Sequence, residues 1–325
     1  MGNNSEKQKG NRIALSMLSV AGALILLLFS SVSLGWFSSN KTVENKSMGL
    51  TATENPFELG AESRAGSFDG YLSAADGDSL IGVPLYGGGS INLTATGEGK
   101  PEVKWLIGDN SHFGNNTDKG IEPGSSGRLT FYVIPKQNGS LNLRFMLDTI
   151  LYDREAEENA DNSAHIIPDS EEAVSLVKGH ILFFRSYDEE SGVYSQPIAD
   201  EGFTYTIENA EENTAYRVDF YWVWPLFADQ LILPRGDSLL RAKGYKRIIP
   251  DDLSLFSEAN LSRYFAGSGE ITLSMVENIM GGSEAPGFSP EYYSILNGKW
   301  NEGDQLIGTK VGYVELRLSG DMITP

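Results

Sequence analysis

The stretch that decides the fold runs from Arg217 to Trp224 and reads Arg-Val-Asp-Phe-Tyr-Trp-Val-Trp. Apolar side chains occupy every second position of it, from Val218 through Phe220 to Trp224. Because successive side chains of a strand point to opposite faces of a sheet, this period of two predicts a β-strand with one face in the core. The same alternation assigns Trp222 and Trp224 to the core before any sugar-stacking platform.

The alternation recurs along the chain and predicts a mainly β, antiparallel fold. Further strands are expected over 91–96, 141–147, 203–207 and 314–318. Asn138-Gly139 lies between an apolar run at 128–134 and the run at 140–147. Because Asn-Gly tolerates the positive φ of tight turns, this spacing predicts a β-hairpin.

Helix signals are fewer and come later in the chain. A short helix is expected over 169–179, where Asp169 or Ser170 can cap the start and Gly179 ends it. Two more are expected over 253–265 and 270–280. Residues 54–325 are therefore predicted to form one domain, with a helical insertion at about 234–301 between two strands.

The N-terminal segment predicts export. From Ile13 to Phe37 the chain is uncharged and apolar, and three basic residues precede it, which favours a cytoplasmic N-terminus and an exported remainder. As a permanent anchor, residues 1–35 are long enough to span a bilayer. As a signal peptide, they end in the small-x-small pattern Ser33-Leu34-Gly35, which predicts cleavage before Trp36. Either way, the domain is expected outside the cell or at its surface.

Composition excludes several classes of function. The 325 residues contain no cysteine, so disulfide frameworks, thiolate metal sites and cysteine nucleophiles are absent, as is usual for a bacterial surface protein, most simply a Gram-positive one. The net charge of −19 argues against binding to nucleic acid, because phosphate contacts need clustered Lys and Arg.

The junction after the apolar segment resembles a known family. Residues 34–43 (LGWFSSNKTV) and 48–52 (MGLTA) look like the mature start of the camelysin/TasA-type surface proteins of Gram-positive bacteria. The resemblance implies a jelly-roll-like β-sandwich without enzymatic activity, in which a freed N-terminal strand inserts into a neighbouring subunit and builds matrix fibres. The residues it assigns to that assembly strand are Trp36, Phe37, Val43, Met48 and Leu50.

The same assembly follows from strand physics. If cleavage frees residues 36–53, this segment becomes an extended strand without a fixed partner, and it can pair with an open sheet edge of another copy. The alternative is that residues 36–53 pair within their own chain, or remain a stalk behind an uncut anchor.

Catalytic motifs were sought and not found. The sequence has no Gly-x-Ser-x-Gly elbow, no His-Glu-x-x-His zinc helix and no phosphate-binding loop. Its three histidines, His112, His165 and His180, match no metal-binding spacing and are interpreted as structural. The chain is therefore not expected to be an enzyme, and an exported hydrolase ranks third among the functions considered.

Calcium is the one cofactor that the sequence suggests. Asp76 and Asp78 flank a glycine, and Asp109 and Asp118 lie in an Asn- and Gly-rich stretch. Carboxylate oxygens near glycine turns suit Ca²⁺, but the spacing is not that of an EF-hand, and such clusters are more often metal-free turns.

Two functions remain after these exclusions. The first is a structural surface protein, a matrix-fibre or adhesin subunit, whose partners are its own copies or other surface proteins. The second is a membrane-anchored extracellular binding module for glycans or a protein partner, in which exposed aromatic and acidic side chains make the contacts.

Overall fold

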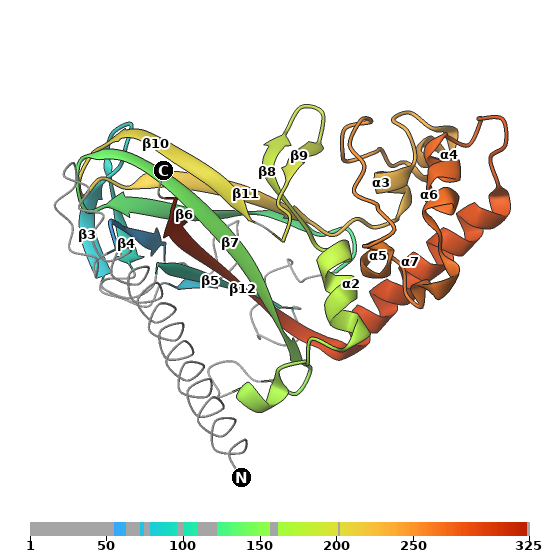
Figure 1. Cartoon of the computed structure of the whole chain (residues 1–325), viewed down its shortest axis with the longest axis horizontal. Helices are drawn as coiled ribbons and strands as arrows, with labels where there is room; N and C mark the ends of the chain where they lie inside the picture. The colour runs from blue at the N-terminus through green and yellow to red at the C-terminus, as the bar shows by residue number, and fades with distance from the viewer. Residues whose placement is uncertain are drawn as a thin grey trace, which may run out of the picture. The chain divides into compact units, whose positions relative to one another are not determined.

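Two antiparallel sheets make the described part of the chain mainly β, and a few helices accompany them (Figure 1). The computed structural model describes residues 55–62, 72–74, 79–95, 101–108, 122–156, 162–200 and 202–323. All of these belong to one unit, Asn55–Pro325.

The described residues contribute seven strands to one sheet and five to the other. The seven-stranded sheet has the order β3 (Ser79–Pro84), β4 (Ser90–Ala95), β1 (Phe57–Ala61), β6 (Ser126–Pro135), β11 (Tyr216–Val223), β8 (Leu182–Asp188) and β9 (Val193–Pro197). The five-stranded sheet has the order β10 (Phe203–Ala210), β7 (Gly139–Asp153), β12 (Val311–Met322), β5 (Glu102–Gly108) and β2 (Leu72–Ala74).

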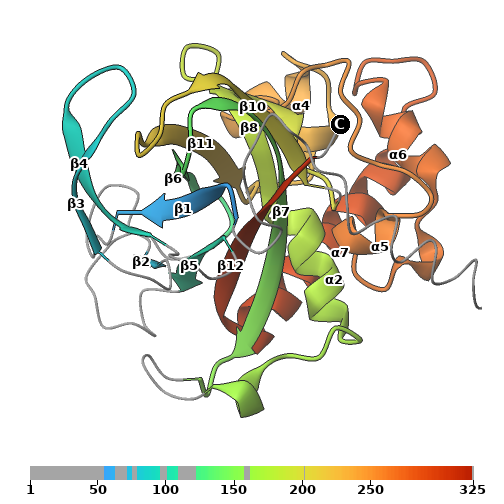
Figure 2. The ribbon, with the colours of Figure 1, turned by 60° about the vertical axis from the view of Figure 1, so that its left-hand side comes forward.

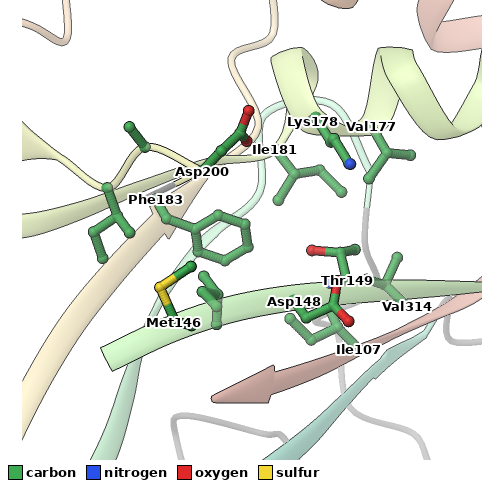
Figure 3. A pocket seen from close by; sticks show the side chains of 13 residues that line it. Ile107, Met146, Asp148, Thr149, Val177, Lys178, Ile181, Phe183, Asp200 and Val314 are labelled. Atoms are coloured by element: carbon green, nitrogen blue, oxygen red, sulfur yellow. Dashed lines mark hydrogen bonds between the residues drawn. The ribbon is translucent and has the colours of Figure 1, made fainter. Parts of the chain in front are cut away.

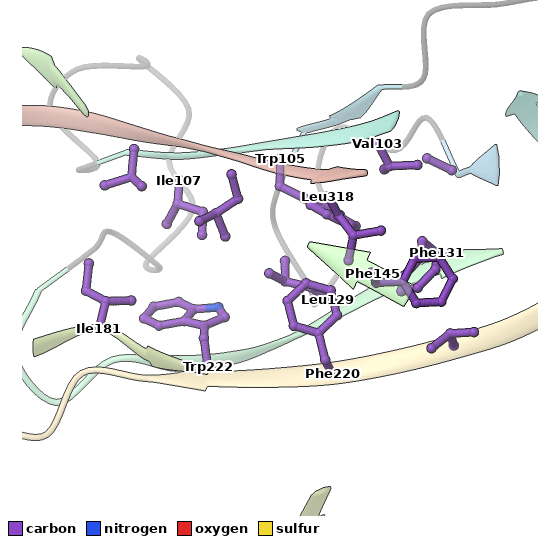
Figure 4. Close-up of a cluster of buried hydrophobic side chains, with 14 of the residues drawn as sticks. Val103, Trp105, Ile107, Leu129, Phe131, Phe145, Ile181, Phe220, Trp222 and Leu318 are labelled. Carbon is purple, nitrogen blue, oxygen red and sulfur yellow. The ribbon is translucent and has the colours of Figure 1, made fainter. Parts of the chain in front are cut away.

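The two sheets share one hydrophobic core. The ring of Trp105 on β5 lies 5.4 Å from that of Phe220 on β11, edge to face, and Phe131 on β6 lies 4.9 Å from Phe145 on β7 (Figure 4). Such pairs add specific geometry to the burial of large apolar rings. Trp222, 1 % exposed, belongs to this core, as the alternation of its strand predicts.

The predicted strands are confirmed, but the predicted hairpin is wrong. The runs at 141–147, 203–207 and 314–318 lie in β7, β10 and β12, and the described part of the run at 91–96 lies in β4. The segments on either side of Asn138-Gly139, however, enter different sheets: β6 pairs with β1 and β11, whereas β7 pairs with β10 and β12. Gly139 has φ +144°, so the turn itself is present, but it carries the chain from one sheet to the other.

The helices of the described residues fall into two groups. The first precedes β8, and the second lies between β11 and β12. They are η1 (Ser163–His165) and α2 (Glu172–His180), followed by α3 (Asp229–Ile232), α4 (Ser238–Lys243), α5 (Leu261–Tyr264), η2 (Ser268–Glu270), α6 (Leu273–Met280) and α7 (Pro290–Lys310).

The helix predictions are confirmed in part. The helix expected over 169–179 is α2, but its N-cap is Glu171, which makes no capping hydrogen bond, so neither Asp169 nor Ser170 is the cap. The expected helix over 253–265 shrinks to α5, because the residues before it form an irregular segment around the buried Arg247. Arg247 donates hydrogen bonds to the carbonyl oxygens of Ile232, Leu233 and Leu253. These bonds satisfy backbone carbonyl groups that have no helical N–H as a partner.

The second helix group packs around a second hydrophobic core, to which β8, β9 and β11 also contribute side chains. Trp300 on α7, Leu231 on α3 and Val276 on α6 are fully buried in it. Both ribbon views place these helices at one end of the two sheets, and α2 packs against α5 and α7 (Figure 1 and Figure 2). The helix α7 was not predicted as such, and it continues to Lys310, where β12 begins directly.

Candidate functional site: an open strand edge beside an apolar cavity

The strand β7 is paired differently on its two sides. On that side it pairs with β12, from Val311 opposite Asp153 to Met322 opposite Leu143. On the other side it pairs with β10, and this pairing stops where Phe203 lies opposite Phe145. Among the described strands, none pairs on this side with residues 146–150. We call this stretch, Met146–Ile150, the open edge.

The open edge ends where another segment covers β7. Tyr152 forms an antiparallel bridge with Ile166, and the Ile167 N–H donates to the Leu151 carbonyl oxygen at 2.9 Å. Because every second residue of a strand directs its N–H and C=O to the same side, Leu147 and Thr149 point their backbone groups to the open edge, as Leu151 does. The open edge therefore offers two residues for pairing.

Gly202 explains why β10 leaves β7 at this point. Its φ is +74°, and its N–H donates to the Ala199 carbonyl oxygen, which closes a tight turn. A Cβ at Gly202 would stand 1.8 Å from the Phe145 carbonyl oxygen. Only glycine permits both this conformation and this approach, so the chain turns away from β7 just before β10 begins.

A cavity of about 430 Å³ lies beside the open edge (Figure 3). Most of the residues that line it are apolar, and they come from both sheets and from α2. The open edge forms one side of it. The volume is in the range of small-molecule and side-chain pockets. The lining residues are Ile107, Met146, Leu147, Asp148, Thr149, Val177, Lys178, Ile181, Phe183, Ile198, Ala199, Asp200 and Val314.

Two charged side chains at this cavity have no ion-pair partner within the described ranges. Asp148 is exposed, and its Oδ1 accepts from the Thr149 N–H at 2.9 Å, which satisfies a donor of the open edge. Lys178 on α2 is also exposed. The third charge, Asp200, is held by Arg263, whose Nη2 lies 2.6 Å from its Oδ2.

A second, smaller cavity of about 200 Å³ shares two lining residues, Ile181 and Val314, with the first. Asp304 lines this smaller cavity, and its carboxylate contacts two buried side chains. Its Oδ1 lies 2.7 Å from His180 Nδ1 and accepts from Trp224 Nε1 at 2.8 Å. The other ring nitrogen of His180 lies 3.1 Å from the Tyr264 carbonyl oxygen.

This arrangement makes His180 a structural residue, as the sequence predicts. Its side chain is fully buried and its ring stacks on Trp300, with centroids 3.9 Å apart. With both nitrogens occupied and no exposed surface, the ring cannot transfer a proton to a substrate. The His180–Asp304 pair instead joins the end of α2 to α7.

The site residues predicted from the sequence cannot be placed in this geometry. The assembly-strand residues Trp36, Phe37, Val43, Met48 and Leu50, the cleavage residues Ser33 and Gly35, and the aspartates 76, 78, 109 and 118 all lie outside the described residues. Within the described ranges, no three His, Asp or Glu side chains are grouped so as to hold a metal ion. No helix in those ranges has the length and apolarity to span a membrane.

The open edge and its cavity were missed by sequence reasoning. A weak signal exists, because the alternation of β7 continues past Leu147 to Thr149 and Leu151, which makes this run longer than the eight residues of β10. The alternation does not show which strands are neighbours, so the difference in length between β7 and β10 is seen only in the structure.

Comparisons with protein-family models, with curated proteins and with solved structures found no match to this chain. The resemblance of residues 34–52 to the camelysin/TasA-type proteins therefore remains a prediction.

Proposed function

We propose that this protein is an exported, non-enzymatic structural protein of the cell surface, a matrix-fibre or adhesin subunit that assembles by strand addition. In this proposal the two sheets are a jelly-roll-like β-sandwich. Residues 36–53 of one copy are the added strand, and the open edge of another copy accepts it. The leader either is removed before Trp36 or stays in the membrane as an anchor.

One observation carries this proposal: a five-residue strand edge, to which no described strand is paired, lies directly beside a cavity lined mostly by apolar residues. An added strand gains main-chain hydrogen bonds at the edge, and its side chains gain buried area in the cavity, which is how β-addition achieves affinity and specificity. Exposed edges of other strands lack such a cavity among the described pockets. The apolar leader and the absence of cysteine support the surface location.

Proline at the open edge tests the proposal. Thr149 directs its N–H away from β12, and in the free subunit this N–H donates to Asp148 Oδ1. Thr149→Pro removes the donor that an added strand would take over from Asp148, while leaving the β7–β12 pairing in place. The matched control is Thr206→Pro on β10, whose backbone groups face away from β7 by the same alternation. We expect electron microscopy of protein processed by its host to show filaments for the wild type and for Thr206→Pro, and none for Thr149→Pro.

Circular dichroism and thermal melting must first show that both variants fold. Filaments formed by folded Thr149→Pro protein at the wild-type concentration would refute strand addition at this edge. If a chain without residues 36–53 still formed filaments, the proposal that residues 36–53 are the added strand would be wrong.

The second candidate is a membrane-anchored extracellular binding module for a glycan or a protein partner. The cavity favours it, because a mainly apolar space of about 430 Å³ with a few charged groups also suits a small ligand. An intact N-terminus on protein isolated from membranes, together with the absence of filaments, would favour this function over the first.

A further inference from the structure

The open edge carries a carboxylate that lacks a cation. Asp148 lies in the middle of the edge, lines the cavity and has no ion-pair partner within the described ranges. Its only described hydrogen bond comes from the adjacent Thr149 N–H, to Oδ1. A carboxylate has two oxygens and about four acceptor positions, so Asp148 can accept further hydrogen bonds from an incoming cation.

The cavity beside Asp148 suits an aromatic side chain. Ile181 and Phe183 form one wall of it, and Val314 forms part of the floor (Figure 3). A ligand that fits both the Asp148 carboxylate and the cavity has a cationic group next to a large apolar group. Backbone amides beside that group would pair with Leu147 and Thr149.

Cleavage of the leader would create such a ligand from the chain itself. A cut before Trp36 produces a new α-ammonium group on a residue with a large aromatic ring, followed by Phe37. An α-amino group has a pKa of about 8, so it is cationic at neutral pH. The segment 36–54 precedes the described domain, and at about 3.3 Å per residue it extends on the order of 60 Å, enough to reach another copy.

We propose that the new N-terminus of one copy docks at the open edge of another, with the Trp36 ammonium on the Asp148 carboxylate and the Trp36 ring in the cavity. This inference rests on the proposed function and names its recognition chemistry. It makes assembly stronger after cleavage, because in the uncut chain the Trp36 nitrogen is a neutral amide. Subunits that keep the leader therefore bind one another more weakly.

Peptide binding to the full chain tests this proposal. The uncut chain, purified in detergent, offers the open edge but has no free Trp36 amine. Two fluorescent peptides of residues 36–53 serve as probes, one with a free N-terminus and one N-acetylated, and anisotropy gives their Kd values. An exposed ion pair contributes about 1 kcal/mol, so we expect the acetylated peptide to bind wild-type protein about fivefold more weakly.

Two variants test whether Asp148 is the partner of the ammonium group. Asp148→Asn keeps the shape and the acceptor for Thr149 N–H, and on it the two peptides should bind equally. Lys178→Met removes the cation across the cavity and should tighten binding of the free-amine peptide. A third test is pH, because binding of the free-amine peptide should weaken as the pH rises through about 8 and that of the acetylated peptide should not.

The possible failures are distinguishable. Equal binding of both peptides to wild-type protein would overturn the docking of the ammonium group and leave strand addition standing. No binding of either peptide, or binding unchanged by Thr149→Pro, would overturn the open edge as the acceptor and with it the proposed function.

Discussion

His180 is held by two acceptors, and this limits the protonation states in which its contacts are satisfied. Nδ1 faces the Asp304 carboxylate and Nε2 faces the Tyr264 carbonyl oxygen. A neutral imidazole has one N–H, so both contacts are hydrogen bonds only if the ring carries two protons or Asp304 carries one. The sequence indicates that His180 is structural, because an apolar run follows it, but its partner lies 124 positions away and is not visible there.

We expect Asp304→Asn to destabilise the protein by about 1–3 kcal/mol, because it alters a carboxylate whose Oδ1 is hydrogen-bonded by the buried side chains of His180 and Trp224. The matched control is Asp252→Asn, at an exposed position, which should change the free energy of unfolding by less than about 0.5 kcal/mol. Urea denaturation followed by circular dichroism measures both. Equal midpoints for Asp304→Asn and wild type would contradict a contribution of these buried hydrogen bonds to stability.

Because the Tyr264 phenol is buried, we expect the folded protein to lose stability at alkaline pH. Burial raises the pKa of its phenol to about 12, from about 10 in the unfolded chain. Because the folded state prefers the protonated form, this contribution is fully present below pH 10 and is lost as the pH rises towards 12. The full shift corresponds to about 3 kcal/mol.

Unfolding midpoints measured between pH 9 and 12 test this, and Tyr264→Phe should flatten the decline. Tyr86→Phe is the control, since that ring is 65 % exposed, and it should follow the wild-type curve. A Tyr264→Phe curve parallel to that of the wild type would assign the alkaline loss to other groups.

Two of the three glycines of α7, Gly298 and Gly303, lie in opposite environments and give a matched pair of substitutions. A Cβ at Gly303 would lie 2.8 Å from His180 Nε2, whereas a Cβ at Gly298 would meet nothing within 4 Å. The His180 ring cannot retreat, because it is stacked on Trp300 and bonded at both nitrogens. We expect Gly303→Ala to destabilise by about 1–3 kcal/mol.

Gly298→Ala should instead stabilise by roughly 0.5–1 kcal/mol, because alanine restricts the unfolded chain and favours helix. Thermal melting of the two variants beside the wild type checks the opposite signs. A rise in midpoint for both would mean that α7 does not press against His180 as closely as the structure shows.

At the scale of elements, sequence patterns predicted whether a segment forms a strand or a helix better than they predicted which strands pair. Alternation located β7, β10, β11 and β12, because a strand with one buried face must show it. It could not reveal that β6 and β7 belong to different sheets, since a turn residue such as Gly139 serves a hairpin and a crossover equally. Nor could it reveal α7, whose glycines and charged residues weaken its apolar stripe.

At the scale of the whole molecule, the repeated alternation predicted the mainly β class but not the candidate site. The open edge results from a difference in length between β7 and β10 and from the turn at Gly202, neither of which leaves a motif. The cavity needs Ile107, Ile181 and Val314, from three separate parts of the chain, to come together. Only the folded chain brings these parts side by side.

Net charge predicts how assembly responds to salt. The chain carries −19, and the remainder would be more acidic still if the leader were removed as proposed, so copies are expected to repel one another. Raising NaCl from about 20 to 200 mM shortens the screening length from roughly 20 to 7 Å, and we expect the critical concentration for filaments to fall. Sedimentation across this series measures it. A critical concentration that rises with salt would mean that attraction between opposite charges dominates assembly.

The place of β12 in its sheet constrains when the protein can fold. This strand lies at the centre of the five-stranded sheet, between β7 and β5, yet it follows β7 by more than 150 residues. Until it has been synthesised, β7 and β5 have no partner between them, and such long-range pairing is slow to form. The hydrophobic core between the two sheets is therefore complete only after β12, the last of the described strands, has been made.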